Sequence, residues 1–445
     1  MEIEMALLPL LLSGLLPLLC LSAFLPDFLR VDGETRGRLG GSWKSKGPGH
    51  IKAKLQPQKV NVTGAATANT TSKISGRSAR LPLLSYGAGI VYMIELDIGT
   101  PSQKLSLILD TGSYTLLVNP DCARAADQNA CESYGYYNTS RSYTSYYLDS
   151  WFVAQFGTGY MEGLWYNDTV YVGQDNLPLP NSRVGVNTWS DYMWAGVLGV
   201  SYGNAWNTGY PTLLDLLVEE GYIEVPIFSL GVGYQGGGSS SDVIFGGVDR
   251  LKFSGYLEPL EIYPNPANQL RLFDQAGYWV NLTSLGITPP DQEEMVLTNG
   301  DFERMMLIDS GSTYTYLDAD LVAVIAKAFN AQIDERGVYY VPCESRDLDG
   351  YINFGFNHGN MIIRVRYADF IIDFDTYCAL GVQPADVGVA TWVLGTSFLR
   401  AAYVVFDQQN NAAWIAQYMP CGDDWITDLT ENAGLELWLD VTGLC

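Results

Sequence analysis

The chain has few basic residues for its length and almost no histidine. Its 445 residues include 25 Lys+Arg, 49 Asp+Glu and two His, which gives a formal net charge of −24 at pH 7. So acidic a protein repels phosphate groups, and we therefore expect no nucleic acid and no anionic membrane surface as a partner. Only 17% of the residues are charged and 47% are hydrophobic, which excludes a disordered polymer and predicts a packed core.

Familiar motifs of metal and nucleotide sites are also missing. The sequence contains no HExxH, no P-loop and no dinucleotide-binding motif, and none of its seven Cys forms a CxxC pair. We therefore expect no metal and no cofactor. The 46 Gly, 29 Tyr and 16 Phe are typical of many short strands joined by turns. Because the chain exceeds the size of a single core, we predict an all-β protein with more than one folding unit.

The N-terminal part of the chain differs from the rest. Ala6 to Leu25 is an almost unbroken apolar run, and residues 1–90 carry 11 Lys+Arg against five Asp+Glu. We interpret residues 1–25 as a secretory signal sequence, with an uncleaved signal anchor as the alternative because Glu2 and Glu4 replace a basic start. Residues 26–83 are basic and poor in large apolar residues, and we interpret them as a propeptide or a solvated linker. A processing point is predicted near Arg80.

Cysteine usage agrees with secretion, either outside the cell or into a vacuole. Cys20 lies in the predicted signal and leaves an even set of six, for which the simplest pairing joins near neighbours. Six thiols permit 15 connectivities, and the short-range set Cys122–Cys131, Cys343–Cys378 and, by exclusion, Cys421–Cys445 is the simplest prediction. Sequons that would accept glycans in a secreted chain occur at Asn61, Asn69, Asn138, Asn167 and Asn281.

One pattern occurs twice in the acidic body. An apolar run ends in Asp110-Thr111-Gly112-Ser113, and a second ends in Asp309-Ser310-Gly311-Ser312, 199 residues later. Each is followed by an apolar pair and a glycine, Val197-Leu198-Gly199 and Val393-Leu394-Gly395. The repeat predicts two similar lobes.

Each repeat places an aspartate at the end of a buried strand. The glycine after it lets another backbone approach closely, and the hydroxyl residues can brace the turn. If the two carboxyl groups meet, they titrate in two separate steps and share one proton over a range of acidic pH. Such a pair can act as a base and an acid in one reaction.

From about Tyr86 to about Cys421 the chain resembles the pepsin-like aspartic endopeptidases (family A1). The resemblance rests on the two Asp-[Ser/Thr]-Gly-Ser motifs, the two apolar-apolar-Gly motifs, and Phe156-Gly157-Thr158-Gly159, which is similar to the flap hairpin. The segments Tyr92 to Gln103 and Trp392 to Gln417 resemble the strand that enters the first motif and the last strands of the fold. Cys343 also has the position of the first Cys of the C-terminal lobe disulfide.

This resemblance implies a bilobal all-β fold with an active-site cleft between lobes of residues 84–263 and 264–422, followed by an acidic tail of residues 423–445. It implies a secreted zymogen that cleaves polypeptide substrates at acid pH, that binds pepstatin-type inhibitors and that carries its own basic propeptide. We expect a monomer.

The family's residue roles transfer to matching positions. Asp110 and Asp309 would hold the attacking water, Ser113 and Ser312 would bond the outer carboxylate oxygens, and Thr111 and Ser310 would brace the turns, with Gly112 and Gly311 beside them. Phe156, Gly157 and Thr158 would close over the peptide. Ile108, Phe156 and Trp194 would line an apolar pocket, which predicts cleavage beside large hydrophobic residues.

Three positions depart from the family pattern. Phe156 replaces the usual flap Tyr, and Leu117 replaces the Trp that this Tyr commonly bonds. The Tyr hydroxyl and the Trp indole N–H are lost together, so neither is left without a hydrogen-bond partner. We therefore expect an apolar repacking of the flap and reduced or altered turnover. Thr396 replaces a frequent Asp after the second Leu-Gly.

Two other functions fit parts of the sequence. Gly199 to Gly203 has the G-x-S-x-G form of a serine hydrolase, with Ser201 as nucleophile and His358 as base. The flanking strand–helix pattern is missing, however, and Gly199 already belongs to the repeat. A pepsin-like protein that binds without cutting is the second alternative, and the retention of both Asp residues argues against it.

Overall fold

The computed structural model describes ten stretches of the chain, all within the unit Gly40–Cys445. They are residues 50–59, 90–125, 128–157, 159–173, 176–203, 208–235, 241–264, 277–385, 392–422 and 425–445. The predicted signal sequence, the processing point near Arg80, the sequons at Asn61 and Asn69, and flap residue Thr158 lie outside them.

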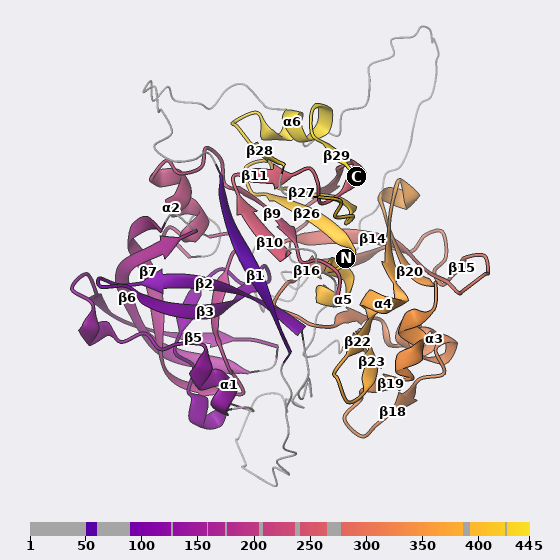
Figure 1. The fold of residues 1–445 in the computed structure, drawn as a ribbon, viewed down its shortest axis with the longest axis horizontal. Coiled ribbons are helices and arrows are strands. Elements are labelled where there is room, and N and C mark those ends of the chain that lie inside the picture. Colours follow the sequence, from indigo (N-terminus) through magenta and orange to yellow (C-terminus); the bar gives the residue numbers. More distant parts are fainter. Residues whose placement is uncertain are drawn as a thin grey trace, which may run out of the picture. The chain divides into compact units, whose positions relative to one another are not determined.

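The largest sheet joins strands from both halves of the chain (Figure 1). It contains 13 strands, and β26 from the C-terminal half pairs with β9 from the N-terminal half, with Val404 opposite Leu230. In spatial order the strands are β13 (Glu258–Glu261), β27 (Ala412–Gln417), β26 (Ala402–Asp407), β9 (Ile227–Gly231), β10 (Ser241–Phe245), β1 (Ile51–Lys59), β2 (Ile90–Ile98), β3 (Gln103–Asp110), β8 (Gly196–Gly199), β4 (Leu116–Val118), β7 (Leu177–Asp191), β6 (Tyr160–Val172) and β5 (Tyr146–Gln155).

The C-terminal half adds a second large sheet and a smaller one. The eight-stranded sheet runs β21 (Met361–Arg366), β20 (Tyr351–Phe356), β14 (Trp279–Thr288), β16 (Arg304–Ile308), β25 (Val393–Leu394), β17 (Thr315–Leu317) and β24 (Val382–Pro384), with β15 (Met295–Val296) beside β14. The four-stranded sheet runs β18 (Gln332–Ile333), β19 (Tyr339–Val341), β23 (Cys378–Leu380) and β22 (Ile371–Asp373). Strands dominate both halves, so the all-β prediction is confirmed.

Helices are short and lie between strands. They are α1 (Gln128–Ser133), α2 (Leu213–Glu219), α3 (Ala319–Ala328), α4 (Tyr367–Phe370), α5 (Thr396–Leu399) and α6 (Ala433–Leu439), with the 3₁₀ turns η2 (Cys122–Arg124), η3 (Thr139–Arg141), η5 (Cys343–Asp347) and η6 (Asn357–Gly359). No helix in the described part of the chain is both long and apolar enough to cross a membrane.

The repeated motifs adopt the same strand pattern in each half. In the first half, β8 lies parallel to β3 and antiparallel to β4, which in turn lies parallel to β7. In the second half, β25 lies parallel to β16 and antiparallel to β17, which lies parallel to β24. The repeat read from the sequence therefore corresponds to two copies of one arrangement, and the bilobal prediction is confirmed.

Strand β1 comes from the segment that the sequence predicts to be a propeptide. It lies between β10 and β2, with Ala53 opposite Val243 and Gln58 opposite Val91. Ile51 and Ala53 are buried. Part of the basic front is therefore a strand of the main sheet, whether or not it is later removed.

The acidic tail forms secondary structure. Its strands β28 (Ile426–Asp428) and β29 (Thr442–Leu444) pair with β11 (Gly247–Asp249) and β12 (Ser254–Tyr256), and Leu437 of α6 is buried. The tail is thus packed on the strands that precede the C-terminal half.

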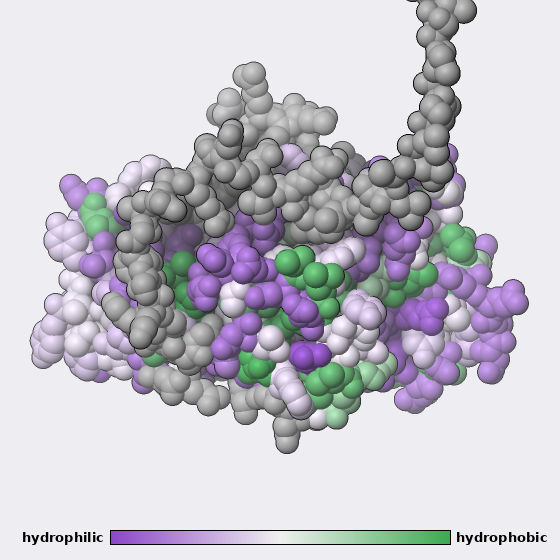
Figure 2. Space-filling model, turned by 90° about the horizontal axis from the view of Figure 1, so that it is seen from above, coloured by the Kyte–Doolittle hydropathy of each residue, from purple (hydrophilic) through white to green (hydrophobic). Residues whose placement is uncertain are grey.

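On the face seen from above, hydrophilic residues surround small hydrophobic patches (Figure 2).

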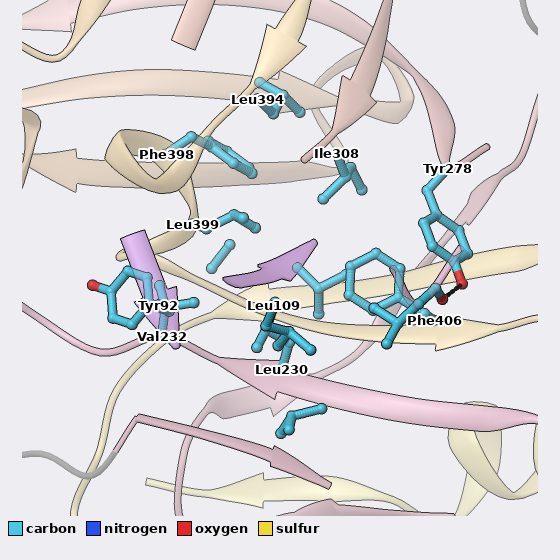
Figure 3. Packing of buried hydrophobic residues seen from close by; sticks show 14 of the residues in the cluster. Tyr92, Leu109, Leu230, Val232, Tyr278, Ile308, Leu394, Phe398, Leu399 and Phe406 are labelled. Atoms are coloured by element: carbon cyan, nitrogen blue, oxygen red, sulfur yellow. Dashed lines mark hydrogen bonds between the residues drawn. The ribbon is translucent and has the colours of Figure 1, made fainter. Parts of the chain in front are cut away.

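The core continues directly behind the two repeated motifs. Leu109 and Ile308, the residues that precede the two aspartates, belong to one buried cluster with Phe406 and Tyr278 (Figure 3). Tyr278 donates its hydroxyl hydrogen to the carbonyl of Val200 at 2.9 Å, which ties the second half of the chain to the first. This packing fixes the strand ends on which the aspartates stand.

Candidate active site

The two aspartates stand at the ends of equivalent strands. Asp110 is the last residue of β3 and lies opposite Gly199 of β8, while the amide of Asp309, just after β16, donates to the carbonyl of Leu394 at 3.1 Å. The apolar runs before them form strands because alternate side chains, such as Leu105, Leu107 and Leu109, enter the core.

The structure brings the two carboxyl groups together. A methyl group added to Gly311 would lie 2.6 Å from Oδ1 of Asp110 and 3.2 Å from Oδ1 of Asp309. One added to Gly112 would lie 2.7 Å from Oδ1 of Asp309. Glycine is therefore required at both positions for this close approach.

Hydroxyl groups tie the two turns to each other beneath the carboxyls. Thr111 donates from Oγ1 to the carbonyl of Ile308 at 2.9 Å and accepts from the amide of Ser310 at 2.9 Å. Ser310 makes the reciprocal pair, donating to the carbonyl of Leu109 at 2.7 Å and accepting from the amide of Thr111 at 3.1 Å. Both side chains are fully buried, so these four bonds hold the two halves in one register.

Two more hydroxyls and two amides orient the carboxyl groups. Ser113 donates to Oδ2 of Asp110 at 2.5 Å, and Ser312 donates to Oδ2 of Asp309 at 2.6 Å. The amides two residues after each aspartate, on Gly112 and Gly311, donate to the other oxygens at 2.9 and 2.8 Å. Each carboxyl is thus held from both sides by its own turn.

The environment favours a proton on this pair. Burial raises the pKa of Asp110 well above its usual range, and the charge of Asp309 and the hydrogen bond with it raise it further. Hydrogen bonds from Ser113 and Gly112 act in the opposite direction but are smaller. Two ionised carboxyl groups this close repel each other, and this repulsion favours a proton on Asp110.

The predicted flap is the hairpin of β5 and β6. The amide of Phe156 donates to the carbonyl of Gly159 at 2.8 Å, and Gln155 donates from Nε2 to the same carbonyl at 3.0 Å. Phe156 packs against a small buried cluster that contains Leu117. The two residues that replace the usual polar pair are thus in one apolar cluster.

The pocket residues predicted from the sequence fall into two groups. Ile108 and Trp194 belong to one apolar cluster, whereas Phe156 belongs to the cluster of Leu117 and Val197. Ile108 lies opposite Val197 in the ladder of β3 and β8, so the two groups are neighbours. The expectation that all three side chains line one pocket therefore stays a prediction.

Three disulfides are present, Cys122–Cys131, Cys343–Cys378 and Cys421–Cys445. They are the short-range pairs favoured from the sequence. The first ties η2 to α1, and the third joins Cys445 of the tail to Cys421. Among the described residues no group of His, Cys, Asp and Glu could hold a metal ion.

The structure gives no support to the serine-hydrolase hypothesis. Ser201 is 1% exposed, and its amide donates to the carbonyl of Ser113 at 2.8 Å. His358 is an exposed residue of η6, 3.8 Å from Glu303. The hydroxyl is therefore a buried part of the first repeat, away from solvent.

Comparisons with known proteins agree with this geometry. The family model described as eukaryotic aspartyl protease matches residues 91–418.

The chain belongs to the eukaryotic aspartyl proteases.

Among curated relatives, gastricsin of Rattus norvegicus is 27% identical and aligns with 73% of this chain and 80% of its own. Aspartic proteinase yapsin-3 of Saccharomyces cerevisiae is 32% identical over 73% and 66% of the two chains. Secreted aspartic protease 3 of Candida albicans is 29% identical over 80% and 86%.

A solved structure, the aspartic proteinase from Irpex lacteus, matches with a TM-score of 0.57 at 21% identity and covers 74% of this chain and 95% of that one. This likeness supports the fold. Family membership makes the chain an aspartic-type endopeptidase, and the alternative of a binding protein without activity is not favoured.

Sequence reasoning did not single out Tyr316 of β17, which feels the charge of Asp309. Burial and, next, the charge of Asp309 raise the pKa of Tyr316 to about 12. Thr396, the residue that replaces a frequent Asp, donates its hydroxyl hydrogen to the carbonyl of Thr313 at 3.2 Å. Tyr316 follows no motif in the sequence.

Proposed function

We propose that the protein is a secreted endopeptidase that cleaves peptide bonds at acid pH through a water held between Asp110 and Asp309. In this mechanism the ionised carboxyl takes a proton from the water as the water attacks the scissile carbonyl carbon. The protonated carboxyl donates a hydrogen bond to the carbonyl oxygen, and a proton then passes to the leaving nitrogen. No covalent bond to the enzyme forms.

The observation that carries this proposal is the close approach of the two carboxyl groups, since a methyl group added to Gly311 would lie 2.6 Å from Oδ1 of Asp110 and 3.2 Å from Oδ1 of Asp309. The raised pKa of Asp110 supports a singly protonated pair in acid. Ser113 and Ser312 keep each outer oxygen bonded, so the inner oxygens point to the water and the substrate. Electrostatic organisation of this kind needs no rearrangement during the reaction.

Specificity for large hydrophobic residues is part of the same proposal. The apolar clusters of Ile108 and Trp194, and of Phe156 and Leu117, border the strand that ends in Asp110. Apolar side chains of a peptide would bury surface against them. Phe156, Gly157 and Thr158 would then close over the bound chain and limit the access of water.

We further infer that residues 26–83 act as a propeptide. Lys52 of β1 lies 3.0 Å from Asp242 and 3.9 Å from Asp249, and both carboxylates are nearly fully buried. Removal of β1 would leave two buried carboxylates without this cation, which is costly at neutral pH and less so in acid.

We also propose that the protein is released from the cell and carries glycans at Asn138, Asn167 and Asn281. The apolar run of residues 6–25 and the name of one relative, secreted aspartic protease 3 of Candida albicans, support release from the cell.

The test is digestion of denatured haemoglobin or casein by the purified protein at acid pH, with and without pepstatin. We expect cleavage that pepstatin blocks and that Ser201→Ala leaves unchanged. N-terminal sequencing of the active material locates the processing point, and sequencing of the products shows the residues beside each cut. Cleavage that persists in pepstatin but is lost in Ser201→Ala would contradict the proposal.

A further inference from the structure

Tyr278 makes hydrogen bonds toward both aspartate motifs but belongs to neither. It comes directly before β14, and its backbone carbonyl accepts from the amide of Ile308 at 3.0 Å. Ile308 is the residue that precedes Asp309. The backbone of Tyr278 is therefore bonded to the strand that ends at the second aspartate.

The hydroxyl of Tyr278 reaches the turn of the first aspartate. It donates to the carbonyl of Val200 at 2.9 Å, and the amide of Val200 donates to the carbonyl of Asp110 at 2.9 Å. Three hydrogen bonds that pass through one side chain thus connect the backbone of Asp110 to the residue before Asp309.

The ring of Tyr278 is held in one place. The side chain is fully buried, and its ring centroid lies 4.5 Å from that of Phe406 (Figure 3). The ring of Tyr202 packs on it as well, at 5.1 Å between centroids. A side chain packed in this way keeps one rotamer, so the spacing between the two backbones that Tyr278 joins is set by a rigid group.

Gln408 fixes the direction of the hydroxyl. It follows β26 directly, and its Nε2 donates to the hydroxyl oxygen of Tyr278 at 2.7 Å. The hydroxyl hydrogen is thus left to bond the carbonyl of Val200. Burial raises the pKa of Tyr278 well above its usual range, so the hydroxyl remains a donor in acid and at neutral pH.

We propose that Tyr278 is a positioning residue for the reaction and sets the placement of Asp110 relative to Asp309. The proposal rests on the proposed aspartic mechanism, which needs both carboxyl groups at one water molecule. Thr111 and Ser310 already join the two turns directly. One connection leaves the turns free to rotate about it, whereas a second at another point fixes their angle as well.

The test replaces Tyr278 by Phe, which keeps the ring and removes the hydroxyl that bonds Val200. We expect kcat to fall about tenfold while KM stays within about twofold, because binding surface is kept and the alignment of the carboxyl groups is lost. Both constants are measured on one peptide at one acid pH, and the melting temperature of each protein is recorded.

Tyr403→Phe is the matched control. Tyr403 is also buried, and its hydroxyl donates to Oγ of Ser229 at 2.8 Å and accepts from the amide of Asp249 at 2.8 Å. Its loss should lower the melting temperature about as much as Tyr278→Phe does, because each change removes a buried hydroxyl with two partners. We expect kcat of the control to stay within about twofold of wild type.

Gln408→Leu is a second variant, which tests the proposal even if Tyr278→Phe fails to fold. It leaves the Tyr278 hydroxyl in place but removes the donor that directs it toward Val200. We expect kcat to fall about threefold with little change in KM.

Amide hydrogen exchange provides a readout that needs no cleavage. Peptides of the full chain that contain Val200 should exchange at least about fivefold faster in Tyr278→Phe than in Tyr403→Phe. If wild type cleaves no peptide, the proposed function fails while the exchange ratio still decides the role of Tyr278.

Tyr278 would have a purely structural role if the two tyrosine variants lost kcat equally or showed equal exchange at Val200. A kcat of Tyr278→Phe within twofold of wild type would likewise overturn the proposal.

Discussion

Replacing Thr111 by Val tests whether the buried hydroxyls hold the two halves of the site together. The change keeps the shape of the side chain but removes the hydroxyl that donates to the carbonyl of Ile308 and accepts from the amide of Ser310. Both groups are buried in the core, so each loses its partner at a cost of roughly 1–3 kcal/mol. We therefore expect Thr111→Val to lower the free energy of unfolding by about 3 kcal/mol.

The measurement is urea unfolding of Thr111→Val and wild type at one acidic pH, together with kcat and KM on a peptide. Thr188→Val is the matched control, because the hydroxyl of Thr188 is exposed and makes one bond of 3.2 Å to the carbonyl of Glu162. It should change stability by less than about 0.5 kcal/mol. We expect kcat of the Thr111 variant to fall while KM changes little, since the aspartates are displaced relative to each other. Equal stability loss in the two variants would refute the role given to this hydroxyl.

Three further predictions concern the tail, the aspartate pair and the flap. Replacing Cys421 and Cys445 by Ser should lower stability by about 3 kcal/mol, as measured by thermal unfolding, because it opens a loop with a sequence separation of 24 residues; no loss would show that the tail is held without the bond. Because burial and Asp309 raise the folded-state pKa of Asp110, the wild type should lose stability relative to Asp110→Asn as the pH rises through that raised pKa, and a stability difference that is constant with pH would contradict this. Phe156→Ala should lower kcat/KM at least about tenfold whereas Phe156→Tyr should stay within about threefold, because the ring, which packs on the Leu117 cluster, is kept only in the second; equal effects of the two changes would deny the ring a role.

The parts of the fold that follow repeated motifs could be predicted from the sequence. Asp110 and Asp309 are each preceded by apolar strand residues and followed by glycine, and this local pattern already requires a strand that ends in a tight turn. The later Gly199 and Gly395 complete the pattern because an added methyl group would lie within 2.5 Å of the turn backbone at both. Local sequence and final structure agree there.

Other parts carry a local signal that their basic or acidic surroundings obscure. Strand β1 alternates Ile51, Ala53 and Leu55 with polar residues, which is a strand signal, but the basic surroundings favour a linker. The buried residues Ala433 and Leu437 of α6 likewise have a helical spacing within an acidic segment.

Some residues near the site are distant in the sequence and are brought together only by the pairing of strands. A cavity beside the Cys122–Cys131 disulfide is formed by residues from β3, α1, β7 and β8, which are up to about 90 positions apart and share no motif. Tyr316 lies opposite Val393 because β17 pairs with β25, which in turn pairs with the strand that precedes Asp309. Such groupings follow from the sheet as a whole.

The most direct test of the mechanism is the turnover of Asp110→Asn, Asp309→Asn and the double variant, each purified as folded protein and assayed on one peptide at acid pH. If the two carboxyl groups act as a unit, each single change lowers kcat at least about 10³-fold and the double change costs little more than either one. A single variant that stays within tenfold of wild type, or losses that multiply in the double variant, would contradict the account.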